Sequence, residues 1–206
     1  MRSVVKALQR ILPTLFVAAA GFAFLWHATD GFGAFTAEAA RRQKIERDPV
    51  YVAETELTDY TGRSISLSGG GDSITLVEFI YATCPTICQT AGSDFFRLRE
   101  RLHSSGLADK VRMISVSFDP QRDDNENLSG YAKLHGADGA VWTIARPHLR
   151  DVPRLLKTFG VTIIADGFDG YQHNTAIHII DQSGRLVAIV DTDDISGAAA
   201  VVESLL

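Results

Sequence analysis

The two cysteines of this chain are the residues whose type and spacing most plainly allow chemistry. Cys84 and Cys88 lie four positions apart, directly after the apolar run Ile74–Ile80, and the sequence of 206 residues contains no other cysteine. Two thiols at this spacing can close a small disulfide or bind a soft metal ion together. Packing as two inert apolar side chains is the weaker alternative, because a chain that uses cysteine nowhere else rarely places both at a strand-to-helix junction. The pair therefore predicts thiol redox chemistry or metal binding.

The N-terminal segment indicates the compartment in which these thiols act. Arg2, Lys6 and Arg10 precede the uncharged apolar run 11–26, and the chain turns polar from His27 onward. Basic residues before an apolar segment keep the N-terminus in the cytoplasm, so the remainder is expected in the periplasm, beyond the bacterial inner membrane. An apolar helix of this length rises roughly 24 Å, short of the ~30 Å hydrocarbon core, so length alone leaves a retained anchor and a cleaved signal open.

The position of the best cleavage pattern favours a retained anchor. A small-x-small pattern at 37–39 lies about ten residues beyond the apolar run, farther than signal peptidase usually cuts. We therefore expect one N-terminal transmembrane helix. Segment 1–35 is assigned as membrane anchor or signal segment, 36–50 as a linker and 51–206 as one globular domain.

The charge balance excludes one large class of partners. The chain has 20 basic and 25 acidic residues, and segment 1–30 holds three of the basic and one of the acidic ones. The remainder therefore carries 17 basic against 24 acidic residues, a formal charge of −7. An exported domain of this charge lacks the basic surface that nucleic-acid binding needs. No nucleic-acid partner is expected.

Periodicity predicts the elements that position the cysteines. A hairpin comes first, with strands at 54–57 and 64–67. Strands and helices then alternate: 74–80, 90–103, 111–118, 128–135, 141–145 and 152–159. A glycine-bearing loop at 165–171 precedes a second hairpin, 177–180 with 186–190, and a final helix, 195–206. This order is that of a thioredoxin-like α/β fold with an N-terminal β-hairpin extension. Reactive groups in such folds gather at the carboxyl ends of the parallel strands, which is where Cys84 falls.

Three motifs together resemble the Sco/SenC family of copper-binding assembly factors of cytochrome c oxidase. They are C-P-x-x-C at Cys84 to Cys88, S-x-D-P at 117–120, and His173, eleven residues before Gly184. The resemblance implies a thioredoxin-like fold, a membrane anchor, and copper, as Cu(I) or Cu(II), bound by Cys84, Cys88 and His173. The chemistry agrees, since a thiolate pair selects soft ions such as Cu(I) and an imidazole completes the site.

Three functions follow from the motifs. The resemblance implies a metallochaperone that delivers copper to the CuA site of an oxidase subunit, with other periplasmic copper carriers or thiol reductants as further partners. The first alternative is a thiol-disulfide reductase that uses Cys84 as nucleophile and Cys88 to resolve, acting on cysteines of the oxidase copper site. Copper binds only the reduced pair, so these two functions can be stages of one cycle. The second alternative, a redox sensor or peroxidase-like enzyme, has only Thr83 as a suitable neighbour.

The remaining candidate residues have simpler interpretations. His178 lies in strand 177–180, an odd number of positions from His173, so it is expected to face the other way and to be a packed or solvent-tipped residue rather than a ligand. Asp119 is either a turn former or a neighbour of the metal ligands. Three further histidines at helix ends or in loops are expected to be solvated or to cap helices: His103, His135 and His148.

Overall fold

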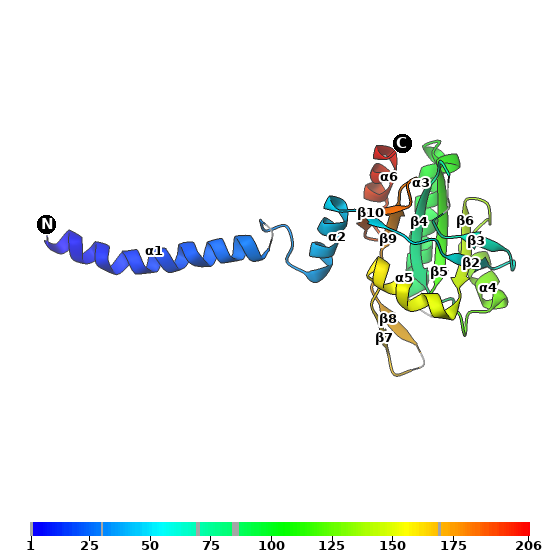
Figure 1. The fold of residues 1–206 in the computed structure, drawn as a ribbon, viewed down its shortest axis with the longest axis horizontal. Coiled ribbons are helices and arrows are strands. Elements are labelled where there is room, and N and C mark those ends of the chain that lie inside the picture. Colours follow the sequence, from blue (N-terminus) through cyan, green and yellow to red (C-terminus); the bar gives the residue numbers. More distant parts are fainter. Residues whose placement is uncertain (1, 30, 69–70, 84–86, 169) are drawn as a thin grey trace. The chain divides into compact units, whose positions relative to one another are not determined.

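The computed structural model describes residues 2–29, 31–68, 71–83, 87–168 and 170–206, with the backbone alone for residues 2–11 and 87–90. The chain divides into two units, Met1–Arg47 and Asp48–Leu206 (Figure 1). Cys84 falls outside the described residues. Cys88 lies where only the backbone is described.

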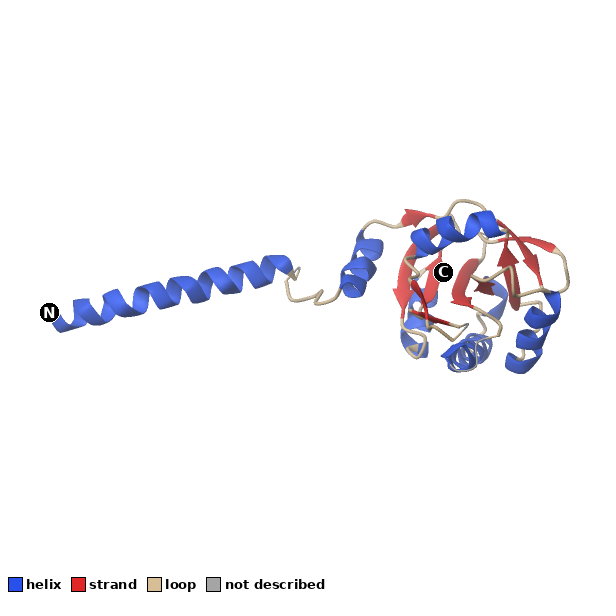
Figure 2. Ribbon diagram, turned by 90° about the horizontal axis from the view of Figure 1, so that it is seen from below, coloured by secondary structure: helices blue, strands red, loops and turns tan. Residues whose placement is uncertain are grey.

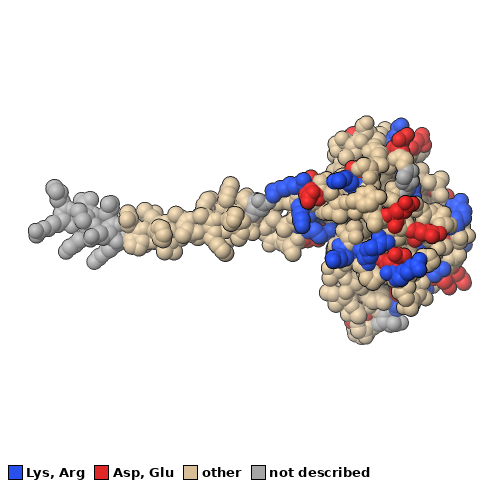
Figure 3. Space-filling view, viewed as in Figure 1, with Lys and Arg blue, Asp and Glu red and all other residues tan. Residues whose placement is uncertain are grey.

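The first unit contains two helices, α1 (Arg2–Ala28) and α2 (Ala37–Arg47). The described side chains of α1 carry no charge (Figure 3). Among the described residues, no helix combines the length and the apolarity that crossing a membrane requires. Helix α2 occupies most of the segment that we expected to be a linker, and its Glu38 pairs with Arg41 at 2.9 Å and Arg42 at 3.2 Å.

The second unit is built on an eight-stranded mixed sheet in the order β1-β10-β9-β4-β5-β6-β2-β3. Its strands are β1 (Val50–Tyr51), β2 (Glu56–Asp59), β3 (Ser64–Ser66), β4 (Ile74–Ile80), β5 (Val111–Ser117), β6 (Trp142–Pro147), β9 (Ile177–Ile180) and β10 (Arg185–Val190). Two short strands, β7 (Ile163–Ala165) and β8 (Tyr171–His173), pair with each other in a separate hairpin. The helices are α3 (Ile87–Ser104), α4 (Asn125–His135), α5 (Val152–Phe159) and α6 (Ile195–Ser204), with short 3-10 helices at Ala108–Lys110 and Leu149–Asp151.

Strand β4 occupies the middle of this sheet, and it is the strand that leads to Cys84. All seven of its residues are buried. It pairs in parallel with β5 and antiparallel with β9. A strand buried on both faces needs a nearly continuous apolar sequence, which the segment 74–80 supplies. Because β4, β5 and β6 are parallel, their carboxyl ends meet at one edge of the sheet.

Helices cover both faces of the sheet, which curls as Figure 2 shows. Phe159 of α5 lies 5.1 Å from Phe79, measured between ring centroids. On the opposite face, Phe95 of α3 lies 5.5 Å from Trp142. Gly160 ends α5 with a φ of 63°, a left-handed conformation that glycine adopts without strain. The core therefore consists of two apolar layers, one on each side of the sheet.

The predicted order of elements is confirmed, with local differences. Helix α4 begins at Asn125, earlier than expected, because the Asp124 side chain accepts a hydrogen bond from the backbone N–H of Asn127 at 2.9 Å. Strand β6 runs to Pro147 rather than Ala145 because it also pairs with β2. The largest difference is the β7–β8 hairpin, where the sequence indicated only a loop.

Candidate copper and thiol site

The described part of the candidate site includes the residues on either side of the cysteine motif in the sequence. Tyr81, Ala82 and Thr83 follow β4 and lead to Cys84, and α3 begins at Ile87. The assignment of Cys84 and Cys88 as thiol ligands therefore stays a prediction. Among the side chains that the structure does describe, no group of three histidine, cysteine, aspartate or glutamate residues is arranged to hold a metal ion.

His173 lies beside this lead-in segment. Its ring centroid is 4.9 Å from that of Phe118, just after β5, and 6.4 Å from that of Tyr81, just after β4. The hydroxyl of Tyr81 donates to the backbone oxygen of Tyr171 and accepts from its N–H, both at 3.3 Å. The structure thus brings His173 to the edge of the sheet where Cys84 follows, although the two residues are far apart in sequence.

The β7–β8 hairpin carries His173, which pairs with Ile163 across the two strands. At its turn the Asp166 carboxylate accepts hydrogen bonds from the backbone N–H groups of Phe168 and Gly170, at 2.8 and 2.9 Å. We expected a flexible glycine-bearing loop here. A sequence signal for the hairpin does exist. Two adjacent β-branched residues, Ile163 and Ile164, are followed by the turn formers Asp166 and Gly167.

The surroundings of His173 favour its metal-binding form. Burial lowers its pKa below the usual value, and a hydrogen bond to the Asn174 backbone carbonyl opposes this only partly. The imidazole is therefore neutral at pH 7. Its Nδ1 lies 3.1 Å from that carbonyl oxygen, and a proton on Nδ1 leaves Nε2 in the form that binds a metal. A half-buried neutral imidazole fits the third ligand of a thiolate copper site.

The S-x-D-P motif, residues 117–120, begins at the end of β5 and continues into the loop before α4. Asp119 is buried and forms a close ion pair with Arg122. The Arg122 guanidinium lies 4.9 Å from the ring centroid of Tyr171, two residues before His173. Arg122 thus contacts both Asp119 and Tyr171 of β8, the strand that carries His173. Asp119 is also a turn former, because its backbone oxygen accepts from the N–H groups of Arg122 and Asp123 at 3.1 and 2.9 Å, so its role beside the metal ligands stays a prediction.

Sequence reasoning missed Asp123, which is fully buried in the same loop. One of its carboxylate oxygens accepts hydrogen bonds from the Ala82 backbone N–H at 2.8 Å and the Ser117 hydroxyl at 2.5 Å. Burial raises its pKa. No local sequence pattern marks this role, because its partner Ala82 lies 41 positions away.

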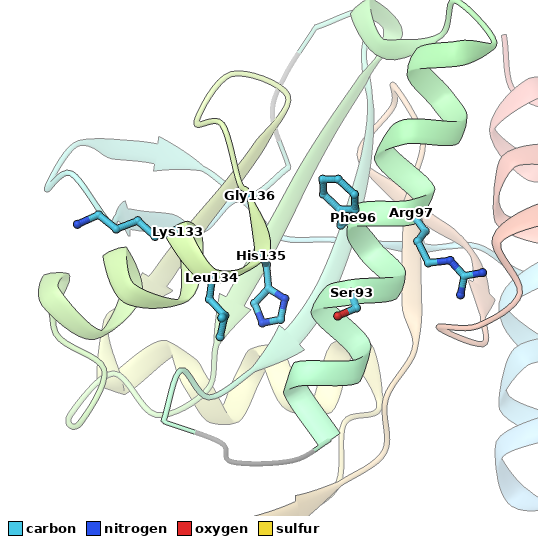
Figure 4. Close-up of a pocket in the computed structure, with 7 residues that line it drawn as sticks. All are labelled: Ser93, Phe96, Arg97, Lys133, Leu134, His135 and Gly136. Carbon is cyan, nitrogen blue, oxygen red and sulfur yellow. The ribbon is translucent and has the colours of Figure 1, made fainter.

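Two hollows help to locate the site. One, of about 590 Å³, lies beside the segment that leads to Cys84 and is lined by Tyr81, Thr83, Arg122, Asn127, Asp166, Phe168 and Gly170. The other, of about 410 Å³, lies between α3 and α4 (Figure 4). Tyr81 and Thr83, in the segment that leads to Cys84, line the first hollow, so we assign that hollow to the candidate site.

The other histidines do not join His173. His178 is 1% exposed, with Nδ1 3.2 Å from the Val77 oxygen and Nε2 3.1 Å from the Phe159 oxygen, which confirms its packed role. His103 and His148 are exposed, as expected. The expectation for His135 was wrong, because it is buried with its ring centroid 4.3 Å from that of Tyr131.

Comparison with known proteins identifies the fold and the family. Similar solved structures share a mixed α/β fold of thioredoxin-like type. Residues 43–206, more than half of the chain, match the SCO1/SenC family. This chain belongs to that family.

Individual relatives are distant. The SCO2-like protein RP587 of Rickettsia prowazekii is 26% identical over 133 residues, a match that covers 63% of this chain and 64% of that protein. Bradyrhizobium japonicum ScoI, solved with copper bound, has a TM-score of 0.61 and 20% identity, with 76% of this chain and 99% of that chain covered. BsSco, described as a member of the Sco family of cytochrome c oxidase assembly proteins with a disulfide switch, has a TM-score of 0.68 and 20% identity, with 77% and 94% covered. At this identity the solved structures support the fold.

Proposed function

We propose that this protein is a copper metallochaperone that binds copper through Cys84, Cys88 and His173 and delivers it to the CuA site of cytochrome c oxidase during assembly. The observation that carries the proposal is the position of His173 beside the segment that leads to Cys84, with its ring 4.9 Å from Phe118. Copper is the cargo here, taken as Cu(I) or Cu(II). Membership of the SCO1/SenC family and the copper-bound relative support the same conclusion.

A second function uses the same two thiols. A thiol-disulfide reductase acting on the oxidase copper site would need Cys84 as nucleophile and Cys88 to resolve, with no part for the imidazole. The disulfide switch described for BsSco favours keeping this candidate. The two functions differ in their need for His173, and this difference separates them experimentally.

The proposed chemistry predicts that copper uptake depends on the redox state of the protein. Mild oxidation should join Cys84 and Cys88 in an intramolecular disulfide, and the oxidised protein should take up no copper until a thiol reductant restores the pair, because thiolates are the ligands. Metal analysis of the purified protein before and after reduction, with thiol titration in parallel, measures this. Equal copper content in both states would place the ion elsewhere.

We further propose that α1 anchors the protein in the bacterial inner membrane, with the second unit in the periplasm. Support comes from the basic residues before the apolar run and from apolar side chains that α1 leaves exposed: Phe16 by 75%, Val17 by 69% and Phe24 by 71%. Exposed apolar surface of this extent needs a cover, and lipid provides one.

The anchor gives a separate prediction. The protein should stay with membranes after an alkaline wash, and protease should reach residues beyond 45 only from the periplasmic side. Cell fractionation with protease protection measures both. Recovery of a soluble form that starts near residue 40 would instead indicate cleavage.

A further inference from the structure

Asp123 stands out because its buried carboxylate bonds to the segment before the cysteine motif. It is 0% exposed, and only one of its oxygens accepts the hydrogen bonds from Ala82 and Ser117. The other oxygen, Oδ1, is buried and has no hydrogen-bond partner among the residues that the structure describes. Burying a carboxylate in this way costs stability, so its place needs a reason beyond packing.

The bond to Ala82 lies at the point where the chain leaves the sheet. The last ladder bond of this segment runs from the Phe118 N–H to the Ile80 oxygen, at 2.9 Å. Beyond it, the Ala82 N–H donates to Asp123 at 2.8 Å instead of to a strand. Ala82 is two residues before Cys84, so this hydrogen bond fixes the course of the chain directly before the first cysteine.

Other residues near Asp123 in the sequence contact β8, the strand that carries His173. The Phe118 ring lies 4.9 Å from that of His173, and the Arg122 guanidinium lies 4.9 Å from the ring of Tyr171. Inside the loop, the Ser117 hydroxyl accepts from the Asp119 N–H at 3.0 Å and donates to Asp123. Segment 117–123 is therefore a single hydrogen-bonded unit that contacts the cysteine lead-in on one side and the histidine strand on the other.

We propose that Asp123 is a positioning residue for copper binding: its hydrogen bond to Ala82 holds the lead-in to Cys84 at the separation from His173 that a shared copper ion requires. This inference rests on the proposed function. Metal–ligand distances tolerate only about 0.2 Å of error, so a lead-in that relaxes loses affinity even when every ligand is present. Asp123 does not itself bind the metal in this proposal.

Three variants of the full-length protein and one control variant, each compared with the parent after thiol reduction, test the role of Asp123. Cu(I) affinity is measured by competition with the chelator bathocuproine disulfonate. We expect Asp123→Ala to weaken Cu(I) binding about 10- to 100-fold, as loss of residues that orient metal ligands commonly does. Asp123→Asn keeps an oxygen that can accept from Ala82 and should recover most of the affinity. Ser117→Ala, which removes one bond to Asp123, should give a smaller loss in the same direction.

Asp138→Ala is the matched control. The Asp138 carboxylate also accepts backbone hydrogen bonds, from Ala140, Val141 and Trp142 at 2.9 to 3.1 Å, but at the amino end of β6, the opposite edge of the sheet. This variant should lose stability in thermal unfolding and keep the copper affinity of the parent.

Several results would overturn the inference. They are a folded Asp123→Ala protein that binds Cu(I) as the parent does, an Asp123→Asn protein as weak as Asp123→Ala, and an Asp138→Ala protein that loses as much affinity. If Asp123→Ala does not fold, Ser117→Ala carries the test, and parental affinity in that variant overturns the inference. A parent protein that binds no Cu(I) when reduced would instead overturn the proposed function itself.

Discussion

His173→Ala should weaken copper binding by one to several orders of magnitude while leaving the fold and the Cys84–Cys88 disulfide intact. Loss of one of three ligands costs on the order of a few kcal/mol, and each 1.4 kcal/mol is a factor of ten in affinity. The fold should tolerate the change because His173 lies on the short β7–β8 hairpin, outside the main sheet. Chelator competition gives the affinity, and thiol titration after mild oxidation reports the disulfide.

His178→Ala is the contrasting variant. Its imidazole contacts backbone oxygens of Val77 and Phe159 in the core, so removal should lower stability and change copper affinity far less. For a protein that acts mainly as a disulfide reductase, His173→Ala should leave thiol exchange nearly unchanged. The assignment of His173 fails if its alanine variant binds copper as the parent does, or if His178→Ala is the change that abolishes binding in a folded protein.

The second large effect concerns Glu78, which is 1% exposed in the centre of β4. Its Oε1 accepts from the Ser115 hydroxyl at 2.5 Å, and Trp142 Nε1 donates to that hydroxyl at 2.9 Å. Oε2 has no hydrogen-bond partner among the described residues. Burial raises the pKa of Glu78 to about 8, with nearby Asp94 adding to the rise and the bond from Ser115 opposing it. The folded protein therefore holds Glu78 protonated at neutral pH.

The raised pKa makes stability depend on pH in a definite direction. The folded pKa is about 8 and the ordinary value is 4.5, so the folded state binds the proton more tightly than the unfolded chain. The parent is therefore most stable below pH 4.5 with respect to this group, and it loses stability as pH rises through 8. Glu78→Gln cannot ionise. Between pH 4 and pH 9 its free energy of unfolding should therefore rise relative to that of the parent by on the order of 5 kcal/mol, from 1.36 kcal/mol per pKa unit.

Urea unfolding of the two proteins between pH 4 and pH 9, with the thiols kept reduced, measures this difference. Glu203→Gln, at an exposed position of α6, is the control and should follow the parent at every pH. Parallel pH profiles for the parent and Glu78→Gln would contradict the prediction.

The sequence predicts the core elements well and the site only in part. The bounds of β4, β9 and α5 match the prediction because buried runs and a terminal glycine define them locally. Strands β7 and β8 were missed because each has three residues and none of them is fully buried, so they leave no core periodicity. The contact between Asp123 and Ala82 joins residues 41 positions apart, and no local pattern encodes it.

The burial of His135 could not be predicted from the local sequence either. It depends on a close approach of α3 to α4 at Gly92, where a Cβ atom would lie 2.5 Å from the Tyr131 hydroxyl and 2.8 Å from the His135 ring. Such an approach is a property of the packed helices. The family resemblance identified His173 as a candidate ligand. Only the fold explains how His173 comes to lie beside Tyr81 and Phe118, near the end of the strand that leads to Cys84.

The separate pairing of β7 with β8 has a consequence for how copper would leave the protein. The proposed ligands lie on two different sheets, since the thiols follow the central strand of the main sheet while the imidazole lies on a hairpin that pairs with no described strand of that sheet. An outward movement of the hairpin would leave the strand pairing of the main sheet intact and would break the two hydrogen bonds between Tyr81 and Tyr171. The ion would then be held by sulfur alone, with an open coordination position for an incoming ligand from the acceptor. Release would proceed by stepwise ligand exchange, and the protein would never have to discharge a bare ion into solvent.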